Sequence, residues 1–363
     1  NVNRALCSGC CGVVCLLAFI LHLKTNRMKP EVSVVIPCFN EVRYIKDCID
    51  SLLSNGTDPS RMELLVIDGG STDGTQALLN ELSQIHPQVK VLSNPDRITP
   101  RALNIGVHAA QGTYILISSA HASFDYGYIS TLISTMNDHS DAIAVGGVME
   151  TKVKNSTAMS ESIRTVLMHP VGVGNAKFRT GVSDVIAVDT VPFGLYRAQE
   201  LKAVGGYDER LIRNHDMELS KRLLRNGGKI YLTPKARCTY YARETFRAMA
   251  KNNFNNGKWN LKTVYITRTF SSLSLRHFIP MLFLGSWTLP LLLSLITWNP
   301  IWSLVSFGVL IGYTGVLTAV AWQVRNGKNK VIMVLIGFKL LHFSYGLGSF
   351  LGLLSLPFTA RTR

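Results

Sequence analysis

The acidic residues of this 363-residue chain are confined to its middle, and this distribution restricts the fold more than any other feature. All 23 Asp and Glu residues lie between Glu31 and Glu244. Before that interval, residues 5–23 contain no Lys, Arg, Asp or Glu, and after it the chain is again mainly apolar. Long apolar runs without acidic residues are typical of membrane segments. The sequence therefore predicts a water-exposed domain between two membrane regions, and it excludes a disordered chain.

Residues 1–29 are expected to form an N-terminal transmembrane anchor. Their uncharged run is long enough to cross a hydrocarbon core of about 30 Å. Lys24, Arg27 and Lys29 follow the run, whereas a single basic residue precedes it. Because cationic residues favour the cytoplasmic side, the next domain is expected to face the cytoplasm. A cleaved signal peptide is the alternative, but it would carry more charge before the apolar run and a small-residue cleavage site after it.

Residues 278–363 are expected to form a C-terminal membrane region of about three helices. The apolar segments are 278–297, 301–322 and 331–354. The first link is short and uncharged, as an external hairpin would be, whereas the second link, 325–330, is basic and is expected in the cytoplasm. Three crossings would place Arg361 and Arg363 outside, against this rule. The last segment also contains Lys339 and His342, so it is either re-entrant or pairs these side chains inside the protein.

Residues 30–277 remain as the water-exposed domain, and the first half of this domain alternates between strand and helix patterns. The expected strands are 32–37, 64–68, 89–92 and 114–117, and the expected helices between them are 41–53, 74–85 and 101–110. Alternation at this spacing predicts an α/β fold with a parallel sheet. Ligands of such sheets bind beyond the carboxyl ends of the strands.

The residues directly after the four expected strands are polar in every case. They are residues 38–41, 68–74, 94–97 and 118–121. Carboxylates, glycines and an arginine at one edge of a sheet suit a nucleotide with its ribose hydroxyls and phosphates. Helix capping is the alternative, since Asn40, Ser71 and Thr75 stand where N-caps are expected.

Several of these segments resemble the family 2 glycosyltransferases, which are inverting enzymes. The resemblance rests on VVIPCFNE (34–41), VIDGGSTDGT (66–75), PRALNIG (100–106), FGLYR (193–197), VGGYDE (204–209), HDMEL (215–219) and RLLRNGGKI (222–230). SAHA (119–122) and NNFNNGKW (252–259) resemble the succinoglycan-type exopolysaccharide glycosyltransferases within that family. The resemblance implies a GT-A-like, mostly parallel sheet with flanking helices, plus transmembrane helices at both ends.

The resemblance also implies a site for a nucleotide-sugar, expected to be a UDP-sugar. The implied residues are Pro37, Asn40, Glu41, Asp68, Ser71, Arg97 and Ser119. In this interpretation Asp68 accepts a hydrogen bond from the uracil ring N–H, and Arg97 contacts the base or the diphosphate. A carboxylate that ends a parallel strand suits the first task because it is fixed at the sheet edge.

The metal site of the family is changed in this sequence. The family carries a carboxylate after the fourth strand, where Ser119 stands here, and a serine hydroxyl is a weak ligand for Mn²⁺ or Mg²⁺. His121 remains as a candidate ligand. Three alternatives stay open: His121 and the diphosphate hold the ion, Lys and Arg neutralise the leaving group instead, or the protein has lost activity.

Asp216 is the residue implied as the catalytic general base. Inversion needs a carboxylate that takes the proton of the acceptor hydroxyl as its oxygen attacks the anomeric carbon. The usual Glu-Asp pair of the family reads His215-Asp216 here, with His215 expected beside the acceptor or the diphosphate. Capping of the following helix is the alternative role for Asp216.

Lys258 and Trp259 align loosely with an Arg-Trp element of related enzymes, which implies a place near the diphosphate and the acceptor sugar. Lysine keeps the charge of arginine but not its planar fork. The alternative is a Trp–Lys pair at the membrane surface.

The charge of the domain is divided unevenly between its halves. Residues 24–150 carry 9 Lys and Arg against 14 Asp and Glu, whereas residues 151–277 carry 22 against 9. The basic half precedes the C-terminal apolar segments and contains no nucleic-acid motif. Anionic lipid headgroups and a lipid diphosphate are therefore the expected partners, and nucleic acid is not.

These observations predict a multi-pass glycosyltransferase of the plasma membrane that moves a sugar to a lipid-linked or cell-surface glycan. Two alternatives remain. One is a processive polysaccharide synthase, and the other is a catalytically silent partner of an active transferase. The sequence indicates no oligomeric state.

Overall fold

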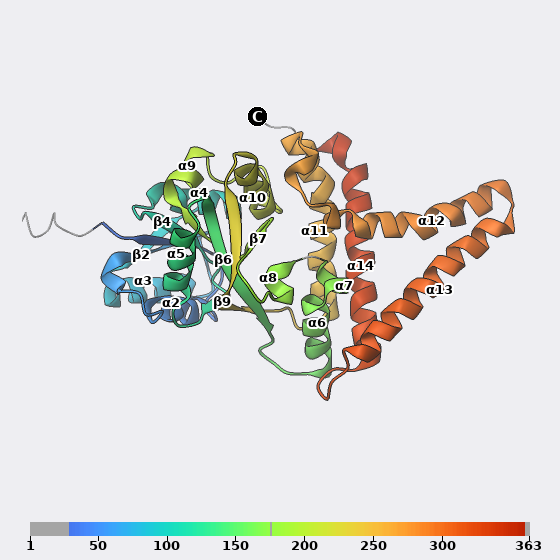
Figure 1. The fold of residues 1–363 in the computed structure, drawn as a ribbon, viewed down its shortest axis with the longest axis horizontal. Helices are drawn as coiled ribbons and strands as arrows, with labels where there is room; N and C mark the ends of the chain where they lie inside the picture. Colours follow the sequence, from blue (N-terminus) through green and yellow to red (C-terminus); the bar gives the residue numbers. More distant parts are fainter. Residues whose placement is uncertain (1–28, 175, 360–363) are drawn as a thin grey trace, which may run out of the picture.

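The computed structural model describes residues 29–174 and 176–359. The expected N-terminal anchor, residues 1–29, therefore lies almost entirely outside the described part. Figure 1 shows a sheet flanked by helices, a layer of long helices beside it, and a pair of helices that projects away from both. We call residues 32–241, which carry the sheet, the sheet domain.

The sheet has nine strands in the order β3-β2-β1-β4-β8-β6-β9-β5, and β7 pairs with β9. The strands are β1 (Val32–Cys38), β2 (Met62–Asp68), β3 (Val89–Ser93), β4 (Tyr114–Ile117), β5 (Ala122–Phe124), β6 (Ala142–Lys152), β7 (Ile186–Val188), β8 (Leu195–Arg197) and β9 (Lys229–Tyr241). β1 pairs in parallel with β2 and β4, and β2 with β3, which confirms the predicted α/β fold. The second half is mixed: β8 is antiparallel to β4 and β6, whereas β6 and β9 are parallel.

Helices cover both faces of the sheet. The helices of the sheet domain are α2 (Ile45–Leu53), α3 (Thr75–Ile85), α4 (Thr99–Ala109), α5 (Tyr128–Asp138), α6 (Ala158–Met168), α7 (Pro170–Val173), α8 (Lys177–Thr180), α9 (Ala198–Ala203) and α10 (His215–Arg225), with a short 3₁₀ turn at Pro59–Arg61. One core lies between the sheet and α2, α3 and α5, and a second core between the sheet and α4, α9 and α10. Every residue of β2 is buried, as expected for a strand covered on both faces.

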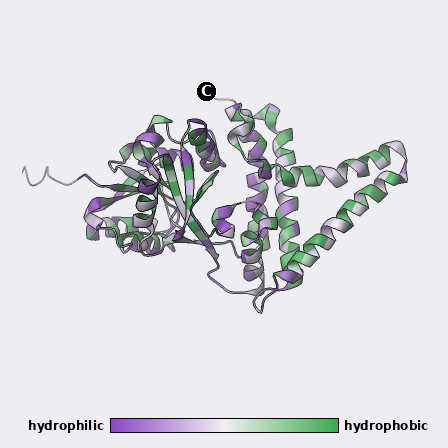
Figure 2. Cartoon of the chain, viewed as in Figure 1, coloured by the Kyte–Doolittle hydropathy of each residue, from purple (hydrophilic) through white to green (hydrophobic). Residues whose placement is uncertain are grey.

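Four long helices follow the sheet domain. They are α11 (Phe246–Thr267), α12 (Ile279–Thr297), α13 (Pro300–Gln323) and α14 (Val331–Leu354), with 3₁₀ turns at Phe270–Ser272, Leu275–His277 and Leu356–Phe358. Among the described residues, α12, α13 and α14 are long and apolar enough to cross a membrane, judged by length and composition. The three predicted apolar helices are therefore confirmed. Figure 2 shows their hydrophobic character and the more polar character of α11.

Helices α11 and α14 pack so closely that glycine is required at their contact. A Cβ atom built on Gly348 of α14 would overlap the carbonyl oxygen of Phe254 in α11. A Cβ atom on Gly257 of α11 would likewise overlap the carbonyl oxygen of Tyr345 in α14. Small residues at such positions allow two helix backbones to approach closely.

We expect Gly348→Ala to destabilise the protein by about 1–3 kcal/mol, because the added methyl group must push α11 and α14 apart. Gly315→Ala in α13 is the matched control, since a Cβ atom there meets nothing within 4 Å. Alanine favours a helix over glycine, so the control should keep or raise the melting temperature. Thermal unfolding in a mild detergent measures both, and equal melting temperatures for the two variants would contradict this packing.

Candidate active site

The carboxyl ends of three neighbouring strands meet at one edge of the sheet. In the register of β1 and β2, Cys38 is paired with Asp68, and β4 ends at Ile117, which is level with Val35 of β1. The polar segments that follow these strands are therefore brought together, as the sequence predicts. We call this region the donor edge.

Asn40 and Ser71 link the loops after β1 and β2. The backbone N–H of Asn40 donates to Ser71 Oγ at 2.8 Å, and the N–H of Thr72 donates to Asn40 Oδ1 at 2.8 Å. The backbone N–H of Glu41 donates to Thr75 Oγ1 at 2.8 Å. Asn40 has a φ of +58°, a left-handed conformation that Asn adopts more readily than most residues. Tyr44 has a non-helical backbone, with a φ of −127°, and therefore α2 begins at Ile45 rather than at the predicted residue 41.

Asp68 is buried at the end of β2 and organises the loop that follows it. Its Oδ1 accepts from Ser71 Oγ at 2.5 Å, and its Oδ2 accepts from the N–H of Gly70 at 3.0 Å and from Gln76 Nε2 at 2.9 Å. Burial alone would raise the pKa of the Asp68 carboxyl, but the hydrogen bonds from Ser71, Gln76 and Gly70 outweigh it and lower the pKa. Asp68 is therefore an anionic hydrogen-bond acceptor at neutral pH. Pro37 is also at this edge, because it precedes Cys38, the residue of β1 that is paired with Asp68.

Arg97 lies against the loop after β2. Its Nε donates to the carbonyl oxygen of Gly69 at 3.0 Å, and its guanidinium lies over the ring of Phe39 at 5.3 Å from the centroid. Arg97 also has a left-handed backbone, with a φ of +57°. Non-glycine residues in this region cluster at functional sites, and here two of them, Asn40 and Arg97, flank the donor edge.

His121, the candidate metal ligand, lies beside the carboxylate of Glu41. The His121 Nε2 and Glu41 Oε1 atoms are 2.8 Å apart, and the His121 ring contacts the edge of Tyr44. Ser119 is part of the same loop, because its Oγ accepts from the backbone N–H of His121 at 3.4 Å. Within residues 29–174 and 176–359, no group of three or more His, Cys, Asp or Glu is placed to hold a metal ion.

A large cavity extends from the sheet domain to the apolar helices. Its volume is about 970 Å³, and Asp216 lines it with an exposed side chain. At the sheet-domain end it includes Thr99, two residues after Arg97. At the other end it includes Phe283 of α12 and Leu341 of α14. The cavity therefore joins the neighbourhood of the donor edge to the apolar helices.

Asp216 and His215 stand in the first turn of α10, where the helix dipole favours an anion. Asp216 Oδ1 accepts from the backbone N–H of Met217 at 2.9 Å, so capping and catalysis are compatible roles for this residue. Burial lowers the pKa of His215 even though the Asp216 charge opposes that shift. His215 is therefore neutral near pH 7, and its ring packs edge-on against Tyr207.

A row of asparagines on α11 fixes the turn that precedes Asp216. Arg213 Nη1 donates to Asn252 Oδ1 at 3.1 Å and to Asn256 Oδ1 at 2.6 Å. Asn214, which has a φ of +61°, donates from Nδ2 to Asn260 Oδ1 at 3.3 Å. Asn252 and Asn256 lie in the segment 252–259 quoted above, but their contact with this turn was not predicted, although Asn252, Asn256 and Asn260 share one helix face.

Asn260 also ties this turn to the apolar helices. Its Nδ2 donates to the carbonyl oxygen of His277 at 2.7 Å, and its Oδ1 accepts from the hydroxyl group of Tyr345 in α14 at 3.3 Å. Asn260 is fully buried. One side chain thus contacts the turn before α10, the link before α12, and α14.

Lys258 and Trp259 do not line the cavity. The backbone of Lys258 packs against Gly348 and Gly352 of α14, and the Trp259 ring lies under the Nζ of Lys262 at 5.6 Å. The cationic residues that line the cavity are instead Arg179, Arg213 and Arg276. The structure thus brings together the predicted donor-edge residues, and places His215 and Asp216 at the cavity.

The sequence comparisons agree with this architecture. The family described as "Glycosyl transferase family 2" matches residues 33–191. Succinoglycan biosynthesis protein ExoA of Rhizobium meliloti (strain 1021) is 31% identical over 253 residues, which cover 68% of this chain and 74% of that protein. The chain belongs to glycosyltransferase family 2, and it is a glycosyltransferase.

A second relative is the dolichyl N-acetyl-alpha-D-glucosaminyl phosphate 3-beta-D-2,3-diacetamido-2,3-dideoxy-beta-D-glucuronosyltransferase of Methanococcus voltae. It is 28% identical over 233 residues, which cover 62% of this chain and 71% of that enzyme. Among solved structures, S. aureus TarS 1-349 in complex with UDP-GlcNAc is 17% identical, with a TM-score of 0.45. That match covers 61% of this chain and 65% of the TarS chain.

Proposed function

We propose that this protein is a membrane-bound inverting glycosyltransferase that moves a sugar from a UDP-sugar to a lipid-linked glycan. The observation that carries the proposal is the cavity of about 970 Å³, which runs from Thr99, two residues after Arg97, past Asp216 to the apolar helices. A water-soluble acceptor would not need a path to α12 and α14. The enzyme is proposed to lie in the plasma membrane, with its catalytic domain facing the cytoplasm.

The chemistry of the cavity wall supports a lipid phosphate or diphosphate as the acceptor's anchor. Arg179, Arg213 and Arg276 supply positive charge near Asp216, and guanidinium groups match phosphate oxygens well. Phe283 and Leu341 supply the apolar end that a lipid chain requires. The Methanococcus voltae relative is named for transfer to a dolichyl-phosphate-linked sugar, which supports the same acceptor class.

Asp216 is proposed to act as the general base. A hydroxyl group of the acceptor sugar attacks the anomeric carbon of the donor, and the bond from that carbon to the diphosphate oxygen breaks. Asp216 takes the hydroxyl proton, and UDP leaves with the bonding electrons. The exposed carboxylate of Asp216 meets the requirement that a base be accessible to its substrate. Arg97 is proposed to hold the diphosphate, and Asp68 the uracil.

The residues at the donor edge fit a divalent cation that is held in part by substrate. Glu41 and His121 are adjacent, and a carboxylate with one further protein ligand is enough when phosphate oxygens and water complete the coordination. Glu41 and His121 would hold Mn²⁺ or Mg²⁺ when it is bound. The ion would neutralise charge on the leaving diphosphate.

Turnover by the purified full chain in lipid nanodiscs tests this function. UDP release would be measured with a set of UDP-sugars, with and without a polyprenyl-diphosphate-linked sugar as acceptor. We expect release that depends on the lipid-linked acceptor. Binding of UDP without turnover for any donor and acceptor pair would favour a catalytically silent protein, and release that builds a long polymer would favour a processive synthase.

We expect His121→Ala to lower turnover at low Mn²⁺ concentration, with partial recovery at high Mn²⁺ concentration, because the variant keeps Glu41 but loses one ligand. His86→Ala is the matched control, since His86 follows α3 at the end remote from the donor edge. Turnover as a function of Mn²⁺ concentration measures the effect. Full activity of the wild-type protein in a metal chelator would contradict a metal-assisted reaction.

A further inference from the structure

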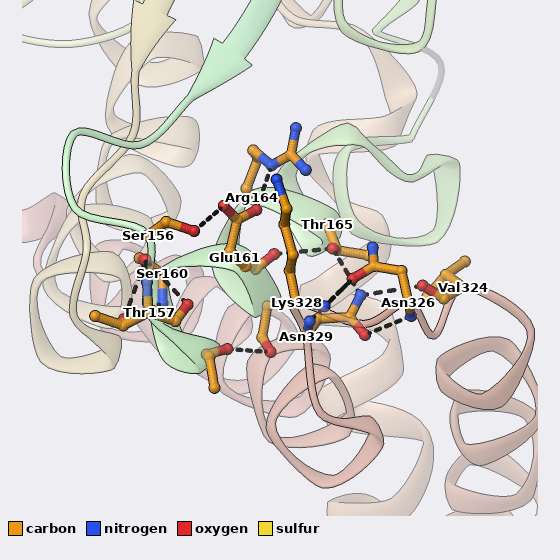
Figure 3. A network of polar contacts seen from close by, with 12 residues as sticks. Ser156, Thr157, Ser160, Glu161, Arg164, Thr165, Val324, Asn326, Lys328 and Asn329 are labelled. Carbon is orange, nitrogen blue, oxygen red and sulfur yellow. Dashed lines mark hydrogen bonds and ion pairs between the residues drawn. The ribbon is translucent and has the colours of Figure 1, made fainter.

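Helix α14 contacts polar parts of the protein along its whole length. At its amino end, Asn329 Nδ2 donates to Thr165 Oγ1 of α6 at 3.1 Å, and the N–H of Lys330 donates to Ser162 Oγ at 3.4 Å. Figure 3 shows this network between α6 and the link before α14. In the middle of α14, His342 Nε2 lies 2.8 Å from the carbonyl oxygen of Val171 in α7.

Helix α11 runs beside α14 in the same direction. Gly337 of α14 lies near Phe246 at the start of α11, and Gly352 lies against Lys258 further along it. At 1.5 Å per residue, the 15 residues between these contacts correspond to about 22 Å of α14. This length is most of a hydrocarbon core of about 30 Å.

Helix α11 cannot accompany α14 through hydrocarbon. It carries four cationic residues, Arg247, Lys251, Lys258 and Lys262, in addition to its row of asparagines. Charged side chains within a bilayer are costly and face the interior of a bundle or a water-filled cavity. If α14 crossed the membrane, α11, α6 and the adjoining part of the sheet domain would be drawn into the bilayer with it.

The outward side of α14 is nevertheless apolar and exposed. Ile332, Ile336, Leu347, Leu351 and Leu354 are exposed and recur at spacings that place them along one stripe of the helix. Arg325, Lys328 and Lys330 lie just before this stripe. An apolar stripe next to cationic residues fits one leaflet of a bilayer with anionic headgroups.

The α12–α13 hairpin differs from α14 in its surroundings. The structure describes every residue of α12, and none of them is buried. The hairpin projects away from the sheet domain in Figure 1, and the side chain of Trp298 at its tip is 90% exposed. The 19 residues of α12 correspond to about 28 Å, close to the thickness of a hydrocarbon core.

We infer that α11 and α14 lie along the membrane surface and that, of the described helices, only the α12–α13 hairpin enters the bilayer. The apolar stripe of α14 rests in the leaflet that faces the sheet domain. The chain beyond α14 therefore stays on the same side of the membrane as the sheet domain. This inference does not depend on the proposed function.

Labelling of single cysteines from each side of the membrane tests the inference. The full chain, with its seven native cysteines replaced by alanine, would carry one cysteine in place of Gln84, Gly327, Trp298 or Thr359. A membrane-impermeant maleimide would be applied to vesicles of known orientation. We expect Gln84→Cys, Gly327→Cys and Thr359→Cys to react from one side and Trp298→Cys from the other. Reaction of Thr359→Cys from the same side as Trp298→Cys would overturn the inference.

A depth measurement gives an independent test if the cysteine-free protein folds poorly. Spin labels at Ile332→Cys and Leu354→Cys, in a chain with only Cys7, Cys10, Cys11 and Cys15 replaced by alanine, report depth through their accessibility to oxygen and to a nickel chelate. The buried Cys38, Cys48 and Cys238 limit background labelling in the sheet domain. We expect similar depths for the two sites, whereas a crossing helix would separate them by about 33 Å.

Discussion

Replacing Asp216 with Asn is expected to lower turnover by about 10²–10⁴-fold, the usual contribution of a positioned general base. Asparagine keeps the shape of the side chain and still accepts a hydrogen bond from the first turn of α10, so the fold should be preserved. The amide cannot take the proton of the acceptor hydroxyl. The loss should therefore appear in kcat rather than in the affinity for the UDP-sugar.

Single-turnover kinetics and calorimetry with the UDP-sugar separate these two quantities. Asp47→Asn is the matched control, because Asp47 occupies the first turn of α2 as Asp216 occupies that of α10, and its side chain is exposed. We expect the control to retain wild-type turnover. If Asp216→Asn transferred sugar at the wild-type rate, another residue would be the base.

The second large effect is expected from Asp68→Asn, which should weaken UDP binding by about 10- to 150-fold. Hydrogen bonds to charged groups contribute about 1.5–3 kcal/mol, and this range corresponds to that loss of affinity. The asparagine amide would also point a donor at the donors of Gly70, Ser71 and Gln76, and so disturb the loop that carries them. Calorimetric titration with UDP measures the change.

Asp73→Asn is the matched control for this experiment, since Asp73 is in the same loop. Its Oδ1 accepts from the N–H and the hydroxyl group of Thr75, which is a capping role at the start of α3. We expect Asp73→Asn to lower stability and to leave UDP affinity within a few-fold of wild type. Equal losses of affinity in both variants would assign the effect to the loop as a whole rather than to Asp68.

The first half of the fold could be predicted from the sequence because its signals are local. The strand patterns at 32–37 and 64–68 are continuous apolar runs, and each structural strand extends the prediction by at most two residues at either end. The second half depends on pairing between distant segments, such as β6 with β9. β7 and β8 have only three residues each, too few for a periodic pattern to be visible.

The candidate site was predictable to a similar degree. Residues of the donor edge follow strands directly, so the topology alone brings Asn40, Asp68 and His121 together. The support for Asp216 comes from α11, roughly 40 residues further along the chain, and no local pattern indicates that the two segments touch. The prediction for Lys258 and Trp259 rests on the resemblance of one short element, and such a resemblance does not indicate in which direction a helix presents its side chains.

The contacts of Asn260 have a consequence for how the enzyme should be handled. Through this residue the turn before Asp216 is hydrogen-bonded, in two steps, to Tyr345 of α14. A detergent that displaces α14 is therefore expected to disturb the turn before Asp216 sooner than the nine-stranded sheet. Inactivation on solubilisation would then be reversible by returning the protein to lipid, and circular dichroism, which reports the helices and strands, would not register it.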